Sequence, residues 1–365
     1  MTLLLSVILL LFSTDSALAQ WVRIDTISYT ALFASGDTII GGYKQVLDPK
    51  IRISTNGGLS WLNAVTSMQP DDRIEVFEKH KGNFYAGLVR DIFWDTCSTC
   101  GGVYRSTDGG MTWHMASAGI PLQLRADIRT LLDYGDTIFA GGSIFQVPPS
   151  LYLSTNAGSQ WENIGDTTLN YFGVGTIVSC GGKLFFNGGT SQSPTIWYST
   201  NSGRSWVAGD SGFPSGAKAL TLECFGNRLF TVARDFWSYF VLATRTDRMN
   251  WRVVHAGLMG GSPGSFASAG RLLLFATGSR VYFLCGNSDT LWKDWSTGLP
   301  VYTAVVITVS KRHVNVSGLY GLWQRPLEQV VSVSGESARL EAMSLQLDQN
   351  FPNPFNGTTR IRFEI

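Results

Sequence analysis

Short apolar runs alternate with polar turns along most of this chain, and a tryptophan leads the segment after each turn. In the clearest case Val103 and Tyr104 precede a Ser-Thr-Asp-Gly-Gly stretch at residues 106–110, and Trp113 follows it. Short Ser and Asp side chains can accept backbone N–H bonds within a turn, and glycine provides the positive φ that a tight turn requires. This pattern predicts two β-strands joined by a self-capped turn, with the tryptophan packed between sheets.

The pattern Ser-x-Asp/Asn-x-Gly-x-x-Trp recurs, which indicates a repeat architecture. Its complete copies are Ser54/Asn56/Gly58/Trp61, Ser106/Asp108/Gly110/Trp113, Ser154/Asn156/Gly158/Trp161 and Ser199/Asn201/Gly203/Trp206. Weaker copies start at Thr246 and Ser288 and lack the turn glycine, so we expect those turns to close differently. The Trp anchors of the repeat are Trp21, Trp61, Trp113, Trp161, Trp206, Trp251 and Trp295.

A second phrase, a turn followed by a short apolar strand, lies between consecutive anchors. Its copies are at residues 36–42, 82–87, 135–141, 182–186, 226–230, 270–274 and 313–318. Each period therefore accommodates four short strands, which is the content of one propeller blade. The sequence predicts an all-β, seven-bladed β-propeller over residues 20–327, in which an N-terminal strand at residues 20–25 completes the last blade. An open solenoid, the alternative, would leave that strand unpaired.

Composition is consistent with one large all-β domain and a tail. The chain has 365 residues, a formal net charge of +1 and 15% charged residues, so nothing favours a nucleic acid or an anionic membrane surface as partner. No segment after residue 20 is long and apolar enough to predict a membrane-spanning helix. We expect a monomer.

Residues 1–19 are predicted to be a signal peptide. A short apolar run at residues 3–12 precedes Ala17-Leu18-Ala19, which fits a small-x-small cleavage site, although no Lys or Arg precedes the run. The mature protein is therefore expected to be secreted or to lie on the outer cell surface.

Five cysteines allow three interpretations of the Cys97-Ser-Thr-Cys100 pair: a local disulfide, half a metal site or a redox pair. No second pair has matching spacing, so we expect no metal and no cofactor, and a loop-stapling disulfide is favoured. Cys180 and Cys224 hold equivalent strand positions in successive blades. They are predicted to be small buried hydrophobes rather than a bridge, and Cys285 likewise.

The loops that join the second strand of a blade to the third vary most, and propeller geometry places them on the face where ligands are expected. Candidate ligand-binding residues on these loops are Arg90, Asp91, Trp94, Asp95, Arg234, Asp235, Trp237 and Tyr239. Exposed aromatics beside charges suit sugar stacking or peptide binding. The alternative is that the aromatics pack onto their own loops. Asp91, Asp95, Asp127 and Asp235 could reach the same face and provide the paired carboxylates that a hydrolase would need. The alternative for each of them is a loop cap or a solvated charge.

The repeat ends near residue 327. Residues 328–343 are Ser/Glu-rich, as a linker is, and residues 344–365 contain two prolines and then an alternating strand-like stretch at 360–365. One strand cannot form a domain, so this end is expected to be truncated.

Two family resemblances follow from these residues. The four complete repeat turns resemble Asp boxes (bacterial neuraminidase repeats), found in sialidases, xyloglucan-degrading glycosidases, sortilin-type receptors and the photosystem II assembly factor. In those families the box is a structural turn. The stretch with Asn350, Pro352, Asn353, Pro354, Phe355 and Asn356 resembles the start of a type IX secretion system C-terminal sorting domain. This resemblance implies export by Bacteroidota-type secretion machinery.

We interpret the chain as an exported, non-catalytic propeller that binds carbohydrate or protein through its loop face. The alternative is a glycoside hydrolase, which needs two carboxylates about 5–10 Å apart. The Arg-Ile-Pro motif that the sialidase resemblance would imply is absent, and the nearest string is Arg23-Ile24-Asp25. The histidines (His80, His114, His255 and His313) show no metal or triad spacing. A sorting tail argues against an assembly-factor role.

Overall fold

The computed structural model describes residues 20–45, 48–70, 72–90, 100–122, 126–144, 150–165, 173–189, 195–236, 238–256, 263–278, 280–286, 291–300, 306–333, 346–347 and 363–364. The chain divides into two compact units, residues 1–325 and 326–365, and each is described by itself. The predicted signal peptide lies outside the described ranges, and so do the predicted sorting-motif residues Asn350, Pro352, Asn353, Pro354, Phe355 and Asn356.

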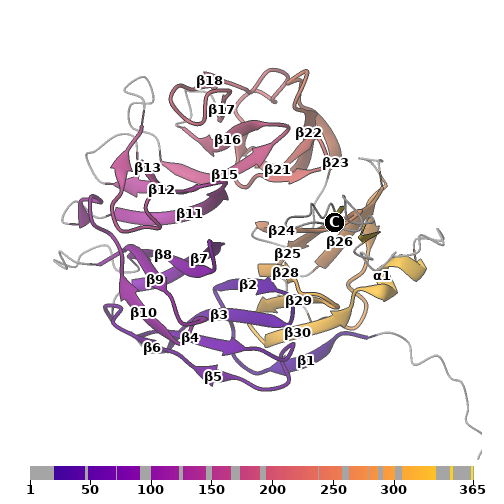
Figure 1. Cartoon of the computed structure of the whole chain (residues 1–365). Coiled ribbons are helices and arrows are strands. Elements are labelled where there is room, and N and C mark those ends of the chain that lie inside the picture. Colours follow the sequence, from indigo (N-terminus) through magenta and orange to yellow (C-terminus); the bar gives the residue numbers. More distant parts are fainter. Residues whose placement is uncertain are drawn as a thin grey trace, which may run out of the picture. The chain divides into compact units, whose positions relative to one another are not determined.

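The first unit is a seven-bladed β-propeller, which confirms the predicted all-β class and blade number (Figure 1). Each blade is one sheet. The innermost strands, in blade order, are β2 (Ala31–Ser35), β7 (Asp72–His80), β11 (Ala126–Tyr134), β15 (Val174–Cys180), the pair formed by β19 (Lys218–Ala219) and β20 (Glu223–Phe225), β24 (Pro263–Ala269) and β28 (Val306–Val309). The second strands are β3 (Thr38–Gln45), β8 (Asn83–Arg90), β12 (Thr137–Ile144), β16 (Lys183–Gly188), β21 (Arg228–Arg234), β25 (Leu272–Thr277) and β29 (His313–Gly318).

The third strands are β4 (Asp48–Ser54), β9 (Gly102–Ser106), β13 (Leu151–Ser154), β17 (Ile196–Ser199), β22 (Tyr239–Arg245), β26 (Arg280–Cys285) and β30 (Gly321–Pro326). The outer strands are β5 (Leu62–Asn63), β10 (Thr112–Met115), β14 (Glu162–Asn163), β18 (Val207–Ala208), β23 (Arg252–Ala256), β27 (Lys293–Asp294) and β1 (Val22–Asp25). In addition, β6 (Val65–Thr66) pairs in parallel with β10.

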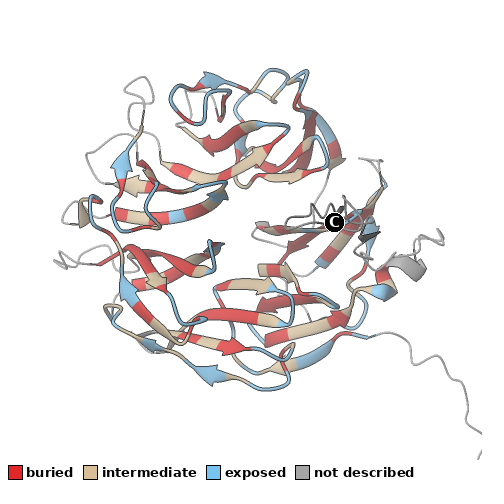
Figure 2. Ribbon diagram, in the orientation of Figure 1, coloured by how far each residue is buried: buried red, intermediate tan, exposed pale blue. Residues whose placement is uncertain are grey.

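The core of each blade lies in its two middle strands, as the red segments of Figure 2 show. Every residue of β25 is buried, and so are the six central residues of β8. The outer strands β5 and β14 are exposed. A middle strand packs against neighbouring blades on both faces, which is why its apolar residues follow one another without alternation.

The N-terminal strand closes the ring, as the sequence predicts. Strand β1 pairs antiparallel with β30, with Val22 opposite Gln324 and Arg23 opposite Trp323. The last blade is thus assembled from both ends of the propeller sequence, in the order β1-β30-β29-β28.

The four complete repeat turns are self-capped by their own side chains. In each, the serine hydroxyl accepts the amide N–H of the turn glycine at 2.8–2.9 Å, and it donates at 2.8–2.9 Å to the Asp or Asn side chain two residues after the serine. The first contact joins Ser54 to Gly58, Ser106 to Gly110, Ser154 to Gly158 and Ser199 to Gly203. The second joins the same serines to Asn56, Asp108, Asn156 and Asn201.

The turn glycines also face the preceding blade closely. Gly110 and Gly158 have φ values of 98° and 74°, in the left-handed region that favours glycine. A Cβ atom at Gly110 would lie 2.9 Å from Ile53 Cδ1, and one at Gly158 would lie 2.8 Å from Tyr85 Cε1. The sequence pattern predicted only that these glycines allow the tight turn. In the structure they also allow close packing between neighbouring blades.

The tryptophan anchors differ from one another in their contacts. Trp61 is half-buried and stacks on Tyr29, whereas the other anchors are buried. The indole of Trp113 donates to the carbonyl of its own turn residue Gly110 at 2.8 Å, but that of Trp161 donates to Ala116 of the preceding blade at 2.7 Å. The tryptophan anchor therefore stabilises its own turn in one blade, as Trp113 does, and links two neighbouring blades in another, as Trp161 does.

The weaker copy in the fifth blade is in a different register from the one that sequence analysis assigned. Thr244 lies opposite Leu229, as Ser199 lies opposite Leu184 one blade earlier, so Thr244 and not Thr246 holds the serine position. The prediction that this turn closes differently is confirmed, because Met249 takes the positive φ and its amide N–H donates to the carbonyl of Arg245. The turn of the sixth blade at residues 288–290 lies outside the described residues.

The prediction for Cys180 and Cys224 was wrong, because the two form a disulfide with a Cα–Cα distance of 5.5 Å. Both lie on innermost strands, β15 and β20, and neighbouring inner strands converge toward the propeller axis. Equivalent positions in successive blades therefore come within bonding distance there, which sequence spacing does not reveal. Cys285 is a half-buried free thiol. Cys100 is disulfide-bonded, whereas Cys97 lies outside the described residues.

The second unit contains α1 (Glu328–Val333), where the sequence predicted a linker, and a strand pair. The pair joins β31 (Gln346–Leu347) to β32 (Phe363–Glu364), with Leu347 opposite Phe363. None of the helices in the described ranges has the length and apolar character needed to span a membrane.

Candidate ligand-binding site

A pocket of about 450 Å³ opens at one end of the fifth blade, where β21 ends and β22 begins. The register of the blade creates it: Arg234 lies opposite Tyr239 on one side and opposite Lys218 on the other. These residues line the pocket together with Asp235 and Phe236. The structure thus brings three of the predicted ligand-binding residues, Arg234, Asp235 and Tyr239, to one place.

The most unusual member of the pocket is Phe236, whose side chain is 95% exposed. A large aromatic ring loses favourable burial when it stands in water, and here polar and charged residues of the same pocket surround it. Phe236 is flanked by the exposed cation Arg234 and the half-buried Asp235. The arrangement offers an apolar surface with polar groups at its rim.

Asp235 has a structural task within the pocket. Its Oδ1 accepts the backbone N–H of Ser238 at 2.7 Å and the Ser238 hydroxyl at 3.1 Å. The amide N–H of Asp235 in turn donates to the carbonyl of Ser238 at 3.1 Å. This carboxylate therefore caps the turn that presents Phe236.

Arg90 does not join this pocket and lies at the junction of the second and third blades. The amide N–H of Arg90 donates to Asp127 Oδ1 at 3.0 Å, and the Arg129 guanidinium contacts Asp127 Oδ2 at 3.3 Å. Asp127, one of the carboxylates considered for hydrolysis, is thus occupied as a link between blades. Asp91, Trp94, Asp95 and Trp237 lie outside the described residues.

Sequence reasoning missed Lys218 and assigned Phe236 no role. Lys218 belongs to the inner strand β19, and only its pairing with β21 brings it beside Arg234. Phe236 could have been found, because it lies in the same aromatic loop as Trp237 and Tyr239. Its exposure, however, depends on how the hairpin turns.

A second hollow, of about 720 Å³, is the central channel of the propeller. Residues from the innermost strands of all seven blades line it, mostly from the ends at which those strands begin. Charged groups in the channel include Arg73, which is paired with Glu75 at 3.0 Å, and also Arg129 and Glu223.

The repeat-turn residues, which sequence analysis treated as structural, line neither hollow. All of them lie in the described ranges: Ser54, Asn56, Gly58, Trp61, Ser106, Asp108, Gly110, Trp113, Ser154, Asn156, Gly158, Trp161, Ser199, Asn201, Gly203 and Trp206. The Ser, Asp and Asn side chains among them bond within their own turns, as Asn156 Oδ1 does by accepting the Gln160 amide N–H at 2.9 Å. We therefore assign these residues no part in ligand binding.

Glu223 is the channel carboxyl whose ionisation is most perturbed. Burial raises its pKa to about 7, although the hydrogen bond that the Ser268 hydroxyl donates to Oε1 at 2.8 Å opposes this shift. A carboxyl with such a pKa can exchange a proton near neutral pH. Sequence reasoning had no signal for it, because its neighbours in the channel come from other blades.

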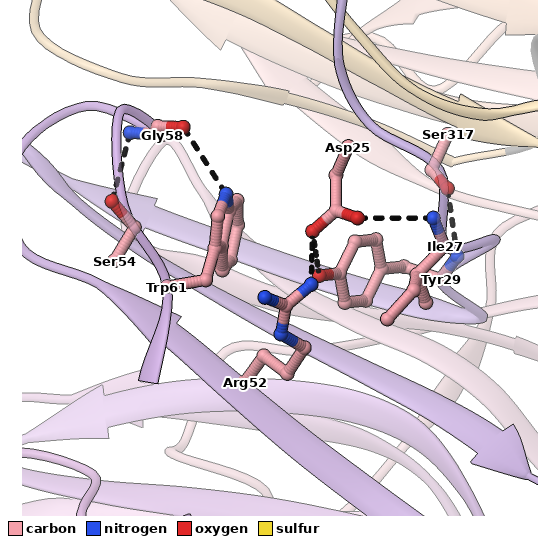
Figure 3. A network of polar contacts seen from close by, with 8 residues as sticks. All are labelled: Asp25, Ile27, Tyr29, Arg52, Ser54, Gly58, Trp61 and Ser317. Atoms are coloured by element: carbon pink, nitrogen blue, oxygen red, sulfur yellow. Dashed lines mark hydrogen bonds and ion pairs between the residues drawn. The ribbon is translucent and has the colours of Figure 1, made fainter. Parts of the chain in front are cut away.

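Asp25, the last residue of the Arg23-Ile24-Asp25 string, belongs to a structural network of polar contacts (Figure 3). The Asp25 carboxylate accepts the Tyr29 hydroxyl at 2.8 Å and the Ile27 amide N–H at 3.1 Å, and it forms an ion pair with Arg52. The Tyr29 amide donates to the Ser317 hydroxyl at 2.8 Å. This network links the first blade to the last. Burial of the Tyr29 hydroxyl raises the pKa of Tyr29 strongly.

The histidines lie apart from both hollows. His80 is buried and its Nδ1 lies 2.6 Å from Asp133 Oδ1 on the next blade, while His255 packs between Tyr282 and Trp292. Burial lowers the pKa of His255. Within the described residues, no three His, Cys, Asp or Glu side chains are grouped as metal ligands would be.

No family model and no curated relative matches this sequence. Solved structures do resemble its fold. The GH74 enzyme of Niastella koreensis is 12% identical over 84% of this chain, with a TM-score of 0.58, and the chain spans only 53% of that enzyme's length. YCF48 bound to D1 peptide is 13% identical over 84% of this chain and 94% of its own, with a TM-score of 0.58.

A third neighbour is the extracellular domain of a hybrid two component system from B. thetaiotaomicron. It is 14% identical over 84% of this chain and 39% of its own, with a TM-score of 0.60. At such low identity these likenesses establish the β-propeller fold and nothing finer. The chain is therefore similar in fold to a glycoside hydrolase, to a peptide-bound propeller and to the extracellular domain of a two component system.

Proposed function

We propose that this chain is an exported, non-catalytic propeller that binds carbohydrate through the pocket of the fifth blade. The observation that carries the proposal is Phe236, which stands 95% exposed in a pocket with Arg234 and Lys218. A sugar ring presents an apolar face to an aromatic ring and hydroxyl groups to its rim, and this pocket offers both kinds of partner.

The polar members of the pocket suit hydroxyl recognition. Arg234 and Lys218 provide several N–H donors, and the Tyr239 hydroxyl can donate or accept. Because Asp235 holds its own turn, it supports the presentation of Phe236 and is not free to act on a substrate. The pocket therefore favours binding over hydrolysis.

The proposed location is outside the cell, with delivery by the type IX secretion machinery. It is supported by the apolar run before Ala17-Leu18-Ala19 and by the motif that includes Asn350, Pro352 and Phe355. The extracellular neighbour domain is consistent with such a location. Tagged protein should be found in the medium or on the cell surface of an expressing cell that carries this machinery.

A glycan array tests the binding proposal, using the chain that begins at Gln20. Phe236→Ala should reduce the affinity for any bound glycan by roughly tenfold or more, since aromatic contacts often dominate such sites. Leu59→Ala is the matched control, because Leu59 is 88% exposed on a turn at the opposite face. Equal glycan binding by both variants would exclude the pocket as the site.

A protein ligand is the competing outcome. An array of extended peptides measured in parallel distinguishes the two, since binding to peptides without glycan binding would transfer the pocket to a protein partner. In either case, loss of ligand binding in the Phe236→Ala variant identifies this pocket as the binding surface.

One observation favours a second candidate function, a glycoside hydrolase with its site in the channel. Glu223, with a pKa of about 7, has the ionisation of a general acid, and Glu75 lies in the same channel paired with Arg73. Release of reducing ends from the array glycans tests this function. Turnover that disappears in Glu223→Gln while Phe236→Ala retains it would replace the binding proposal by the enzymatic one.

A further inference from the structure

A second pocket of the fifth blade is lined by four arginines. It has a volume of about 240 Å³, and Arg228, Arg245, Arg248 and Arg252 surround it together with Thr244. Arg228 begins β21 and Arg245 ends β22, whereas the proposed ligand pocket lies at the other ends of these two strands. The arginine pocket is therefore on the opposite face of the propeller.

The pocket is located at the altered repeat turn. In the complete turns the serine hydroxyl accepts the turn glycine's amide and donates to the Asp or Asn, as Ser199 does with Gly203 and Asn201. In the fifth blade, counting back from Trp251, Thr244 replaces that serine and Arg248 replaces the glycine. The serine hydroxyl of a complete turn bonds to the turn glycine. The Thr244 hydroxyl, at the same position in the fifth blade, makes no such bond among the described residues.

Thr244 shows the consequence most directly. Its side chain is 4% exposed, and its Oγ1 is buried with no hydrogen-bond partner among the described residues, although the residue lines the pocket. A buried hydroxyl without a partner is destabilising, because it has given up its hydrogen bonds to water. The pocket thus contains a polar group that a bound ligand could satisfy.

The charges around the pocket are mostly positive. Arg245 forms a bidentate pair with Asp247, through Nε and Nη2 at 3.1 Å each. The Arg228 guanidinium lies over the Phe230 ring at 5.4 Å and donates to the carbonyl of Gly286 at 3.3 Å, which fixes its position. The residues that line the pocket carry four guanidinium groups and no carboxylate.

We propose that this pocket binds a tetrahedral oxyanion, a phosphate or sulfate group. Guanidinium groups present paired N–H donors that match tetrahedral and planar oxyanions bidentately. The Thr244 hydroxyl supplies a further donor at the buried end. Such a group exists both as a free ion and as an ester on a sugar, and the two sources share the chemistry that this site recognises.

Isothermal titration calorimetry on the full chain, in a low-salt buffer free of oxyanions, tests the proposal. The probes are inorganic phosphate, inorganic sulfate, glucose 6-phosphate and glucose 6-sulfate. Saturable binding with one site per chain is expected for at least one of them. Tighter binding of the esters than of the free ions would identify a sugar-borne group as the ligand, and equal or weaker binding would identify the free ion.

Variants distinguish this site from general surface charge. Arg248→Gln should weaken binding about tenfold or more, and Arg248→Lys should recover only part of the loss because it keeps the charge without the fork. Arg204→Gln is the matched control, since Arg204 is an exposed arginine in the equivalent turn of the fourth blade. Thr244→Val should weaken binding several-fold while leaving the fold intact.

Two results would overturn the proposal. One is the absence of saturable binding with all four probes, and the other is the same loss in Arg204→Gln as in Arg248→Gln. Phe236→Ala should leave the binding of inorganic phosphate and inorganic sulfate unchanged, so failure of the carbohydrate proposal and failure of this one are separately visible.

Discussion

The indole Nε1 of Trp21 donates a hydrogen bond of 3.0 Å to the backbone carbonyl of Trp295, a residue 274 positions further along the chain. The two rings also meet edge to face, with centroids 5.1 Å apart. Arg325, whose guanidinium lies over the Trp295 ring at 4.3 Å, donates to the same carbonyl at 3.2 Å. The strand that closes the ring is thus anchored by a buried residue as well as by its pairing with β30.

This contact predicts that Trp21→Ala destabilises the whole propeller. Loss of a fully packed tryptophan should lower the free energy of unfolding by roughly 3–5 kcal/mol. Trp21→Phe keeps an aromatic ring and loses the hydrogen bond, so it should cost less. Denaturant unfolding followed by tryptophan fluorescence measures both. If Trp21→Ala unfolds at the wild-type midpoint, β1 does not contribute to closure.

The disulfide between Cys180 and Cys224 joins the innermost strands of the fourth and fifth blades. It closes a loop with a sequence separation of 44, so its removal should cost about 4 kcal/mol through the entropy of the unfolded chain. The variant Cys180→Ser/Cys224→Ser is compared with Cys285→Ser, which removes the free thiol. A double variant as stable as Cys285→Ser would contradict the prediction, and thermal unfolding under non-reducing conditions provides the readout.

Asp108 stabilises its turn as a hydrogen-bond acceptor. It accepts the amide N–H of Thr112 at 2.9 Å and the Thr112 hydroxyl at 2.6 Å, and the latter bond is the main reason why its pKa is lowered to about 2. Asp108→Ala should lower stability by about 1–2 kcal/mol. Asp108→Asn should cost less, because Asn56 and Asn156 accept the corresponding amides of their own turns at 2.9 Å.

The pH dependence checks the Asp108 assignment. Since the folded-state pKa lies below the ordinary value of 3.8, the stabilisation is present above pH 3.8 and is lost as the pH falls toward about 2. The stability difference between wild type and Asp108→Asn should therefore shrink over this interval. A constant difference in acid unfolding curves would show that the carboxylate is not the acceptor.

For Glu223 we expect the opposite pH dependence of folding stability, near neutral pH. Its folded-state pKa of about 7 exceeds the ordinary value of 4.5, so its neutral form is favoured in the folded protein. Stability should be greatest below pH 4.5 with respect to this group and should fall as the pH rises from there through about 7. Glu78, whose pKa burial also raises to about 7, acts in the same direction.

The variants Glu223→Gln and Glu223→Gln/Glu78→Gln isolate this effect. Each substitution should flatten the fall in unfolding free energy between pH 5 and pH 8, by roughly 1–3 kcal/mol per group, and the double variant should be flattest. Urea midpoints across this range provide the measurement. Identical slopes in wild type and double variant would mean that neither carboxyl is held neutral by the fold.

Blade number, turn chemistry and closure of the ring could all be predicted from the order of the residues. These are local or periodic properties: Ser54 caps its own turn, each period carries one anchor such as Trp113, and the segment led by Trp21 lacks a partner within its own period. A repeat makes these properties recognisable, because the same short pattern of residues occurs several times along the sequence.

The contacts between blades, in contrast, became visible in the folded ring alone. The Cys180–Cys224 disulfide, the placing of Lys218 beside Arg234 and the perturbed Glu223 each depend on strand register or on convergence toward the axis. Distances between segments far apart in sequence are set by packing of the whole ring, and no spacing along the chain encodes them directly.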